Sequence, residues 1–384
     1  MAETLGTLFP DAEDGAAARP QHSTGILPYQ VIRELVRSRE IDATAEIEDA
    51  QIQPASIDLR LGATAHRVRA SFLPGAGVPV AAKIDELGMH AIDLTGGAVL
   101  EKGCVYIIPL IEALSLSSRI SGTANPKSST GRLDVFTRLI TDGAIEFDRV
   151  KAGYKGPLYA EISPRAFSIL VRKGSRLNQL RFRRGSPAHS DSALRRLHEE
   201  VRLVHSADGR ENIDRGIAIT VDLTAADGGD LVGYRARKHT GVIDVEKIDH
   251  YAVSDFWEPV RARGDKGLIL DPNDFHILAS KEAVTVPPDH AAEMVPYDTL
   301  VGEFRVHYAG FFDPGFGYSD AGGAGSRAVL EVRSHEVPFV IEDGQVVGRL
   351  VYERLTGVPD RLYGRDVGSS YQRQGLMLAK QFKR

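Results

Sequence analysis

The sequence predicts a mainly β protein built from two tandem copies of one β-barrel or sandwich domain. The first observation is internal repetition, because the second half of the chain matches the first at an offset of 170, as from Glu161 to Glu331 and from Gly174 to Gly344. The second is that short segments of alternating apolar and polar residues recur in both halves, separated by glycine and proline. The third is that these segments do not alternate with helical patterns, so a parallel α/β fold is not indicated.

The apolar spacing predicts one short helix first and strands afterwards. Residues 28–41 carry Val31, Ile32 and Leu35 at helical spacing, after a proline suited to a first helical turn. In the first copy, alternation predicts strands at residues 56–62, 105–109, 113–116, 158–162 and 167–171. In the second copy it predicts strands at residues 217–223, 275–278, 283–286, 328–332 and 337–341.

Between the copies, a charged segment with Leu194, Leu197, Val201 and Val204 at helical spacing predicts a linking helix. The C-terminal segment is polar and punctuated by glycine, so it is either a disordered end or a flap that orders over a ligand. The predicted organisation is a flexible tail (1–24), a first domain (25–183), a linker helix (184–212), a second domain (213–358) and the C-terminal flap (359–384).

Length and composition set bounds on function. The chain has 384 residues, enough for two domains that each bury a core. Its 47 basic and 52 acidic residues give a formal net charge of -5, which argues against coating a nucleic acid. Cys104 is the only cysteine, so an internal disulfide and a multi-thiolate metal site are excluded. Because no apolar run reaches the roughly 20 residues of a membrane span and the start is acidic, we expect a cytoplasmic protein that binds no membrane.

Residues 125–132 are the most informative polar segment. They combine two cations, three hydroxyls and several backbone amides, a set that can hold a phosphate chain, and include Lys127, Ser128, Ser129, Thr130, Gly131 and Arg132. The alternative interpretation is a polar turn, because the spacing is not that of a Walker loop. The equivalent residues 296–302 of the second copy lack both cations and include Asp298. This difference favours a phosphate site kept by one copy.

A glutamate interrupts an apolar strand in each copy. A carboxylate in such a strand is costly unless it is paired or functional, and a buried acid can carry a proton to and from a substrate. Glu161 is therefore a candidate general acid and base. Its alternatives are a solvent-facing position or an ion pair with Arg165 or Arg172, and the equivalent Glu331 makes a shared structural role plausible.

The histidines do not predict a metal site. His198-Glu199-Glu200 matches the His-x-Glu of zinc deaminases, but their Pro-Cys-x-x-Cys partner cannot exist with one cysteine. No His-x-x-x-His pair is present either, so we expect no protein-bound zinc or other transition metal. Residues 152–156 and 309–317 place aromatic rings between glycines, where a sugar or base could approach, although ordinary β-turns look the same.

Taken in order, these motifs resemble those of the dCTP deaminases, a family with the trimeric dUTPase-like β fold. Residues 53–62 resemble its opening strand, and residues 127–132 resemble its Arg-Ser-Ser-x-x-Arg phosphate motif with Lys127 in place of the first arginine. Residues 149–156 are similar to its Arg-Ile-Asp-Pro-Gly-Trp-x-Gly turn. Tyr159, Ala160 and Glu161 match the strand that bears its catalytic glutamate, while Tyr363, Tyr371 and Gln374 are spaced as in its terminal flap.

The resemblance implies zinc-independent hydrolysis of dCTP to dUTP and ammonia. Glu161 would move the protons, Ser128 and backbone groups would stabilise the intermediate, and Mg²⁺ would be held by the triphosphate and not by the protein. The implied nucleotide-binding residues are Lys127, Ser128, Ser129, Thr130, Gly131, Arg132, Arg149, Lys151, Tyr159, Ala160, Asp313, Tyr363 and Gln374. The partners implied are dCTP, dUTP and further copies of the chain, with a trimer of two-domain chains favoured.

A departure from the family pattern, at the aspartate of its turn, keeps alternatives open. Lys151 stands at the place of the family's aspartate in the first copy, whereas Asp313 occupies that place in the second, so we expect the second copy to supply Asp313 to a composite site. The Asp313 turn also resembles the water-activating motif of dUTPases, which suggests a bifunctional enzyme that releases pyrophosphate from dUTP. If Lys151 has disabled the site, the protein is instead a non-catalytic nucleotide sensor.

Overall fold

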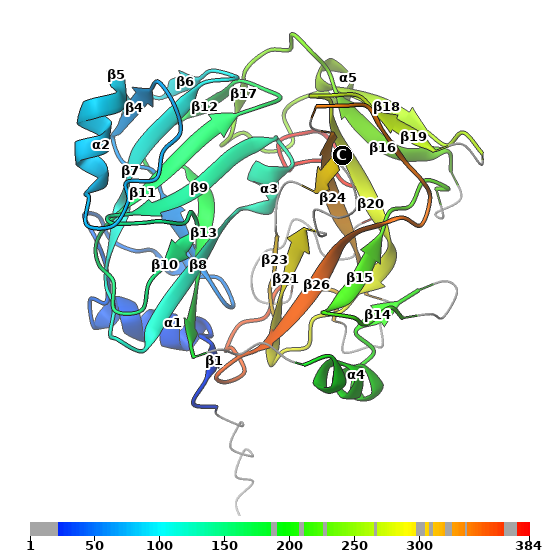
Figure 1. Ribbon diagram of the computed structural model, residues 1–384, viewed down its shortest axis with the longest axis horizontal. Helices are drawn as coiled ribbons and strands as arrows, with labels where there is room; N and C mark the ends of the chain where they lie inside the picture. The colour runs from blue at the N-terminus through cyan, green and yellow to red at the C-terminus, as the bar shows by residue number, and fades with distance from the viewer. Residues whose placement is uncertain are drawn as a thin grey trace, which may run out of the picture.

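The computed structural model describes residues 22–185, 190–206, 211–225, 229–264, 267–296, 304–306, 310–318, 325–334, 336–364 and 375–384. Within these residues the protein is mainly β, which confirms this part of the predicted fold class. The two halves of the chain lie side by side as two groups of mostly antiparallel sheets (Figure 1). None of the described helices is long and apolar enough to cross a membrane.

Antiparallel sheets build the first copy. One has the strand order β1-β13-β8-β10, with β3 also pairing β13, and the other has the order β5-β4-β7-β11-β9, with β2 pairing β7. Their bounds are β1 (Gly25–Ile26), β2 (Ile41–Ala43), β3 (Ile57–Arg60), β4 (Thr64–Val68), β5 (Gly88–Asp93), β7 (Val105–Ser115), β8 (Ile120–Pro126), β9 (Val135–Thr141), β10 (Arg149–Val150), β11 (Lys155–Pro164) and β13 (Arg176–Arg184).

The second copy repeats this plan. Its sheets have the orders β15-β26-β21-β23 and β18-β16-β20-β24-β22, with β14 pairing β20. Their bounds are β14 (Val204–His205), β15 (Ile217–Thr220), β16 (Leu231–Ala236), β18 (Trp257–Arg261), β20 (Phe275–Val284), β21 (His290–Pro296), β22 (Phe304–Val306), β23 (Phe311–Phe312), β24 (Ser326–Ser334) and β26 (Val346–Arg354). The offset of 170 relates β11 to β24 and β13 to β26.

The helices are short and lie around the sheets. They are α1 (Tyr29–Arg37), the 3₁₀ turn η1 (Asp49–Gln51), α2 (Val80–Leu87), α3 (Ser128–Gly131), α4 (Asp191–Glu200) and α5 (Val253–Phe256). The predicted first helix is present and buries Ile32 and Leu35. The linking helix begins after Ser190, whose hydroxyl accepts a hydrogen bond from the Ala193 amide at 3.3 Å.

Two pairs of predicted strands are each one strand in the structure. Residues 105–109 and 113–115 lie in β7, and residues 275–278 and 283–284 lie in β20. The alternation breaks there because the pairing contains irregularities: the register of β11 on β7 shifts between Pro157 and Tyr159, and that of β20 on β24 shifts after Ala279. A β-bulge of this kind adds a residue on one strand without ending the strand.

The two copies share a core as well as having their own. Phe167 of the first copy packs edge-on against Trp257 of the second, with ring centroids 5.3 Å apart. The C-terminal Phe382 also joins this core, 5.9 Å from Trp257, and Leu378 is buried beside it. Apolar burial therefore holds residues 375–384 in place, whereas residues 365–374, which make up most of the segment expected to be a disordered end or a flap, lie outside the described residues.

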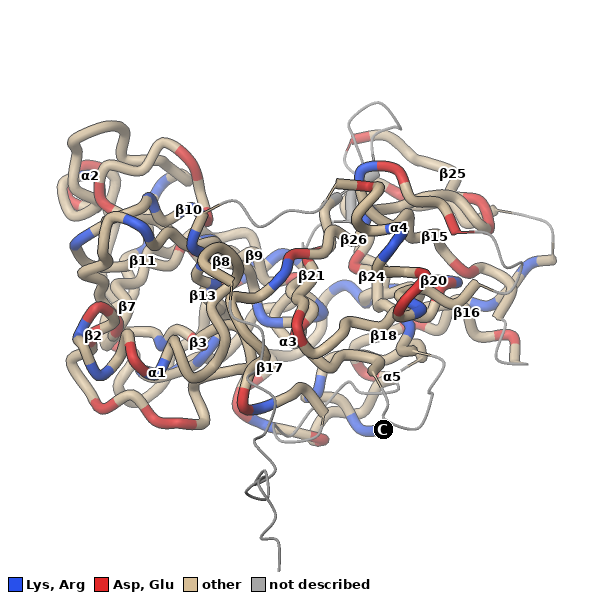
Figure 2. The backbone as a smooth tube through the Cα atoms, turned by 90° about the horizontal axis from the view of Figure 1, so that it is seen from below, with Lys and Arg blue, Asp and Glu red and all other residues tan. Residues whose placement is uncertain are grey.

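A small sheet connects the copies further. β12 (Ile169–Val171) pairs with β6 (Ala98–Leu100) and also, in parallel, with β17 (Ile243–Asp244) from the second half, so this sheet joins the copies. The other small sheet, in which β19 (Leu268–Leu270) pairs with β25 (Phe339–Ile341), lies within the second copy. Arg172 binds both carboxylate oxygens of Asp244, at 2.8 and 2.9 Å. Basic and acidic positions are interspersed along both halves of the chain (Figure 2).

Candidate active site between the two copies

The predicted phosphate-binding segment lies where β8 of the first copy ends. Lys127 has an extended backbone (φ -67°, ψ 147°) and precedes α3, and Arg132 follows that helix. The amides of Thr130 and Gly131 donate to the Lys127 carbonyl at 2.8 and 3.0 Å, which fixes the turn. We call residues 127–132 the phosphate loop.

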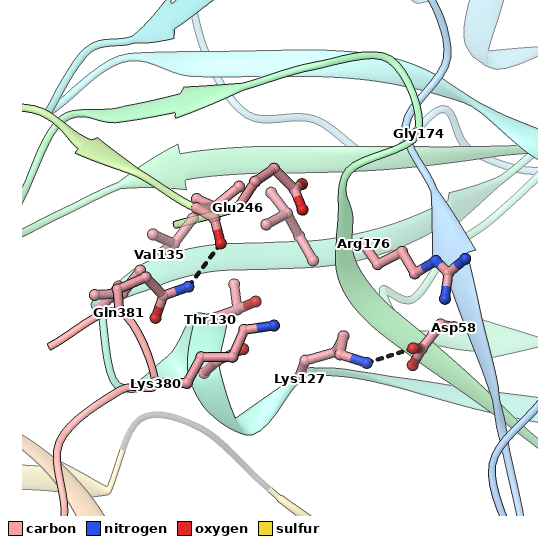
Figure 3. Close-up of a pocket in the computed structure, with 13 residues that line it drawn as sticks. Asp58, Lys127, Thr130, Val135, Gly174, Arg176, Glu246, Lys380 and Gln381 are labelled. Carbon is pink, nitrogen blue, oxygen red and sulfur yellow. Dashed lines mark hydrogen bonds and ion pairs between the residues drawn. The ribbon is translucent and has the colours of Figure 1, made fainter. Parts of the chain in front are cut away.

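The phosphate loop borders a cavity of about 340 Å³, which we call the loop cavity (Figure 3). Lys127, Ser129 and Thr130 line it from the loop. The ammonium group of Lys127 donates to the buried carboxylate of Asp58 on β3, and Lys380 extends into the cavity from the C-terminal segment. Other polar or charged side chains around it belong to Arg176, Glu246 and Gln381.

Arg132 reaches across the boundary to the second copy. Its Nε lies 3.9 Å from Glu331 Oε1 on β24, and the two side chains are only 4% and 9% exposed. Arg132 also donates to the Met377 carbonyl at 3.1 Å. Burial raises the pKa of Glu331 to about 7, although the positive charge of Arg132 acts in the opposite direction. A carboxyl group with this pKa can both take and return a proton near neutral pH.

Asp313 of the second copy also lies close to the phosphate loop. It is buried in the turn after β23, and its Oδ1 accepts a hydrogen bond from Arg181 of β13 at 3.1 Å. Burial raises its pKa against the opposing charge of Arg181, and the charges of Asp58 and Lys127 act on the same carboxyl. Asp313 is thus close enough to the phosphate loop for the charge of Lys127 to act on it, but neither Asp313 nor Glu331 lines the loop cavity.

Tyr363 stands beside the Asp313 turn. Its amide donates to the Pro314 carbonyl at 2.9 Å, and its ring lies 5.8 Å from that of Phe316. Gly315 has φ +96°, and a Cβ there would lie 3.0 Å from the Tyr363 carbonyl oxygen, so a side chain would obstruct this contact. Gln374 and Tyr371, the other expected flap residues, lie outside the described residues.

Glu161 lies in a different cavity, of about 250 Å³, which Lys127, Ser129 and Thr130 do not line. The Glu161 side chain is buried, and its Oε1 accepts from Arg138 Nε at 3.0 Å. Its ion-pair partner is thus Arg138 and neither Arg165 nor Arg172. Its other oxygen, Oε2, is buried and has no hydrogen-bond partner among the described residues.

The remaining predicted residues also lie away from the loop cavity. Arg149 is exposed on β10 and donates to Thr123 Oγ1 at 3.2 Å. Lys151 is exposed and lines a separate depression with Asp142. Tyr159 and Ala160 are buried within β11. None of these four lines the loop cavity.

Several residues of the site carry no local signal in the sequence. Asp58, Arg176, Glu246 and Lys380 come from separate segments, and only the fold brings them to one cavity. Glu331 does carry a signal in the sequence, because it lies 170 residues after Glu161. That equivalence alone suggests a structural role shared by the two glutamates. Its partner Arg132 is far away in the sequence, so no spacing rule connects the two.

The carboxylates of the site do not fit a metal held by the protein. Asp58 is engaged by Lys127, and Asp313 by Arg181, so each faces a cation already. Among the described residues, no group of three or more His, Cys, Asp and Glu side chains could hold a metal ion. Any Mg²⁺ carried by a triphosphate would arrive with that ligand.

Comparison with known proteins agrees with this organisation. Residues 23–186 match the model of the 2'-deoxycytidine 5'-triphosphate deaminase (DCD) N-terminal domain, and residues 190–382 match that of the C-terminal domain. A solved structure described as 2'-deoxycytidine 5'-triphosphate deaminase from Agrobacterium tumefaciens is 57% identical, with a TM-score of 0.83, and the match covers 87% of this chain and 100% of that one.

Curated relatives match over shorter segments. The protein named dCTP deaminase, dUMP-forming, from Halobacterium salinarum is 35% identical over 133 residues, 34% of this chain and 61% of the relative. A protein of the same name from Nocardioides is 31% identical over 125 residues, 32% of this chain and 61% of the relative. The match thus spans about three fifths of the length of these curated relatives.

Proposed function

Because the chain belongs to the dCTP deaminase family, we propose that it hydrolyses dCTP to dUTP and ammonia at the boundary between its two copies. The observation that carries this proposal is the approach of Arg132, at the end of the phosphate loop, to Glu331 of the second copy. It places a phosphate-binding segment beside a buried carboxyl group with a pKa of about 7. We also infer that each copy is a barrel of the dUTPase-like kind.

The phosphate loop would bind the triphosphate. Lys127 supplies a positive charge, and the hydroxyls of Ser129 and Thr130, which line the same cavity, supply hydrogen bonds. Mg²⁺ would bridge the phosphate oxygens. Asp313, buried next to the loop on the second copy, would contact the nucleoside.

Glu331 would move the protons of the reaction. Its carboxylate takes a proton from water as the water oxygen forms a bond to C4 of cytosine, and it passes this proton to N3. Glu331 then carries the proton of the new C4 hydroxyl to the amino nitrogen, the bond from C4 to that nitrogen breaks, ammonia leaves, and the ring becomes uracil. Positioned acid-base catalysis contributes ~10²–10⁴-fold to the rate, so orientation of the water and stabilisation of the intermediate must supply the rest.

Paired substitutions in the two copies test this assignment. The purified protein is incubated with dCTP and Mg²⁺, with EDTA as a control, while ammonia is measured and the nucleotides are separated. We expect Glu331→Gln to keep nucleotide binding and to lose at least ~10²-fold in turnover. Glu161→Gln, the same change at the equivalent position, is the matched control and should retain turnover. The opposite pattern would return the proton transfer to Glu161 and reject the assignment of Glu331.

A second candidate function is a bifunctional enzyme that also converts dUTP to dUMP and pyrophosphate. The curated relatives carry the description dUMP-forming, and Asp313 is a buried carboxyl beside the phosphate loop. In the same incubation, dUMP and pyrophosphate that appear together with ammonia would support it, whereas accumulation of dUTP would contradict it. Nucleotide binding without any product would instead support a non-catalytic sensor.

The assembly of chains is also a proposal. The resemblance implies a homo-oligomer, with a trimer of two-domain chains favoured. Light scattering coupled to size-exclusion chromatography would decide the mass, and a monomer mass of 41.8 kDa at micromolar concentration would contradict it.

A further inference from the structure

We propose that Lys380 is a phosphate-binding residue of the loop cavity and that it helps the site to distinguish a nucleoside triphosphate from a monophosphate. The inference rests on the proposed function and deepens it, because it assigns a role to the C-terminal segment. Lys380 lines the same cavity as Lys127, Ser129 and Thr130, but it comes from the C-terminal segment (Figure 3).

The backbone around Lys380 is fixed by the second half of the chain. The Asp249 amide donates to the Lys380 carbonyl at 2.9 Å, and the amides of His250 and Tyr251 donate to the Gln381 carbonyl at 2.9 and 3.0 Å. The side chain of Gln381 donates to the Val245 carbonyl at 2.8 Å, as Figure 3 shows. Phe382 is buried in the shared core. A lysine on such an anchored segment is preorganised, so little ordering of the chain opposes binding.

Charged side chains of both signs line the loop cavity. Lys127, Arg176 and Lys380 line it, against the carboxylates of Asp58 and Glu246. Arg176 is paired outside this set, with Glu48 at 2.9 Å. Burial lowers the pKa of Lys380, and the positive charge of Lys127 lowers it further, so the two ammonium groups act on each other. An anion between them would relieve this repulsion and satisfy the hydroxyls of the loop.

The positions of the two lysines favour a chain of phosphates over a single one. Lys127 belongs to the phosphate loop and Lys380 to the C-terminal segment, so a polyphosphate that extends from the loop into the cavity would contact both. A monophosphate offers fewer oxygens and less charge for the two ammonium groups to share. Loss of Lys380 should therefore weaken triphosphate binding selectively.

The test compares Lys380→Met with Lys383→Met, a matched control three residues further along the same segment, where the side chain is exposed. We expect Lys380→Met to raise the KM for dCTP about tenfold with kcat little changed, because one charge-assisted contact is lost. Inhibition by inorganic tripolyphosphate should weaken by a similar factor, inhibition by dCMP should not change, and Lys380→Arg should restore most of the affinity. Lys383→Met should behave as the wild type.

Two further measurements keep the result decisive. Thermal unfolding of each variant distinguishes a loss of binding from a loss of folding. If Lys380→Met does not fold, Lys380→Gln, which keeps most of the aliphatic part of the side chain, replaces it. Equal affinity of wild type and Lys380 variants for tripolyphosphate, measured by calorimetry, would overturn the proposal. Because calorimetry needs no turnover, it tests Lys380 even if the wild type deaminates nothing, an outcome that would reject the proposed function alone.

Discussion

The guanidinium of Arg181 on the first copy donates to Asp313 Oδ1 on the second at 3.1 Å, with 0% and 10% of the two side chains exposed. Arg181 also donates to the Ala292 carbonyl at 3.0 Å, and its guanidinium carbon lies 4.0 Å from the centroid of the Phe311 ring. The arginine thus holds the strand and the turn that carry Asp313. This pair fixes the edge of the second copy against the phosphate loop.

Removal of Arg181 should lower the stability of the folded protein, because it leaves the buried Asp313 carboxyl without its ion-pair partner. We expect Arg181→Met to lower the free energy of unfolding by about 3–5 kcal/mol, measured by urea denaturation at pH 7. Arg261→Met is the control, since Arg261 pairs with Asp230 on the surface, where the side chains are 61% and 60% exposed. A surface pair of this kind contributes about 0.2–1 kcal/mol. Equal losses in the two variants would contradict a stabilising role for the buried pair.

The rate of deamination should depend on the ionisation of Glu331. Burial raises its pKa to about 7, so the carboxylate that takes a proton from water forms only as the pH rises through about 7. We expect kcat/KM for dCTP to rise with pH in this range and to level off above it. The measurement is a pH profile of initial rates, and a profile that falls through neutral pH would oppose Glu331 as the base.

Asp148 offers a pH prediction for stability away from the loop cavity. Burial raises its pKa from 3.8 to about 7, so the folded protein binds a proton that the unfolded chain has released between these values. Stability is therefore lost as the pH rises through this interval. Asp148→Asn should remove the loss and gain up to about 4 kcal/mol at pH 8, with little gain near pH 4.

The substitution at Asp148 is otherwise mild. Asparagine can still accept the hydrogen bond that Asp148 Oδ1 receives from the Leu139 amide at 2.7 Å. It also tolerates the φ of +61° at this position. Urea denaturation of both proteins across this pH range gives the difference, and a difference that does not change with pH would show that Asp148 ionises normally.

Gly315 should be more sensitive than an equivalent open turn. Both Gly315→Ala and Gly344→Ala introduce a side chain at positive φ, which costs roughly 1–2 kcal/mol. Only at Gly315 would the new Cβ meet the backbone of Tyr363; at Gly344 nothing lies within 4 Å. We expect Gly315→Ala to lose more stability and also to raise the KM for dCTP, whereas identical behaviour of the two variants would exclude Tyr363 from the site.

The general fold could be predicted because its signals are periodic. Alternation marked the strands, and helical spacing marked α1 and α4. The helix α2 was missed because only Val80 and Ile84 of its residues are buried, too few to produce a pattern. The single strands β7 and β20 were split in prediction because bulged pairing breaks the alternation without ending the strand.

The candidate site could be predicted only in part. The phosphate loop was found because its cations and hydroxyls are consecutive. Glu331 and Glu161 are equivalent by repeat, so sequence alone could not tell which of them faces Arg132; that depends on how the copies pack. Lys380 gave no signal in the sequence, because the residues that line the cavity with it, apart from Gln381, are more than a hundred positions away.

The approach of Arg132 to Glu331 joins two halves of one polypeptide, which makes their encounter intramolecular. Its probability is set by the length and packing of the connecting chain and does not fall on dilution. Dilution of the enzyme should therefore not lower the specific activity by separating Arg132 from Glu331. It also follows that a chain damaged at Arg132 and a chain damaged at Glu331 should not rescue each other when mixed, because each intact half stays tethered to a defective one.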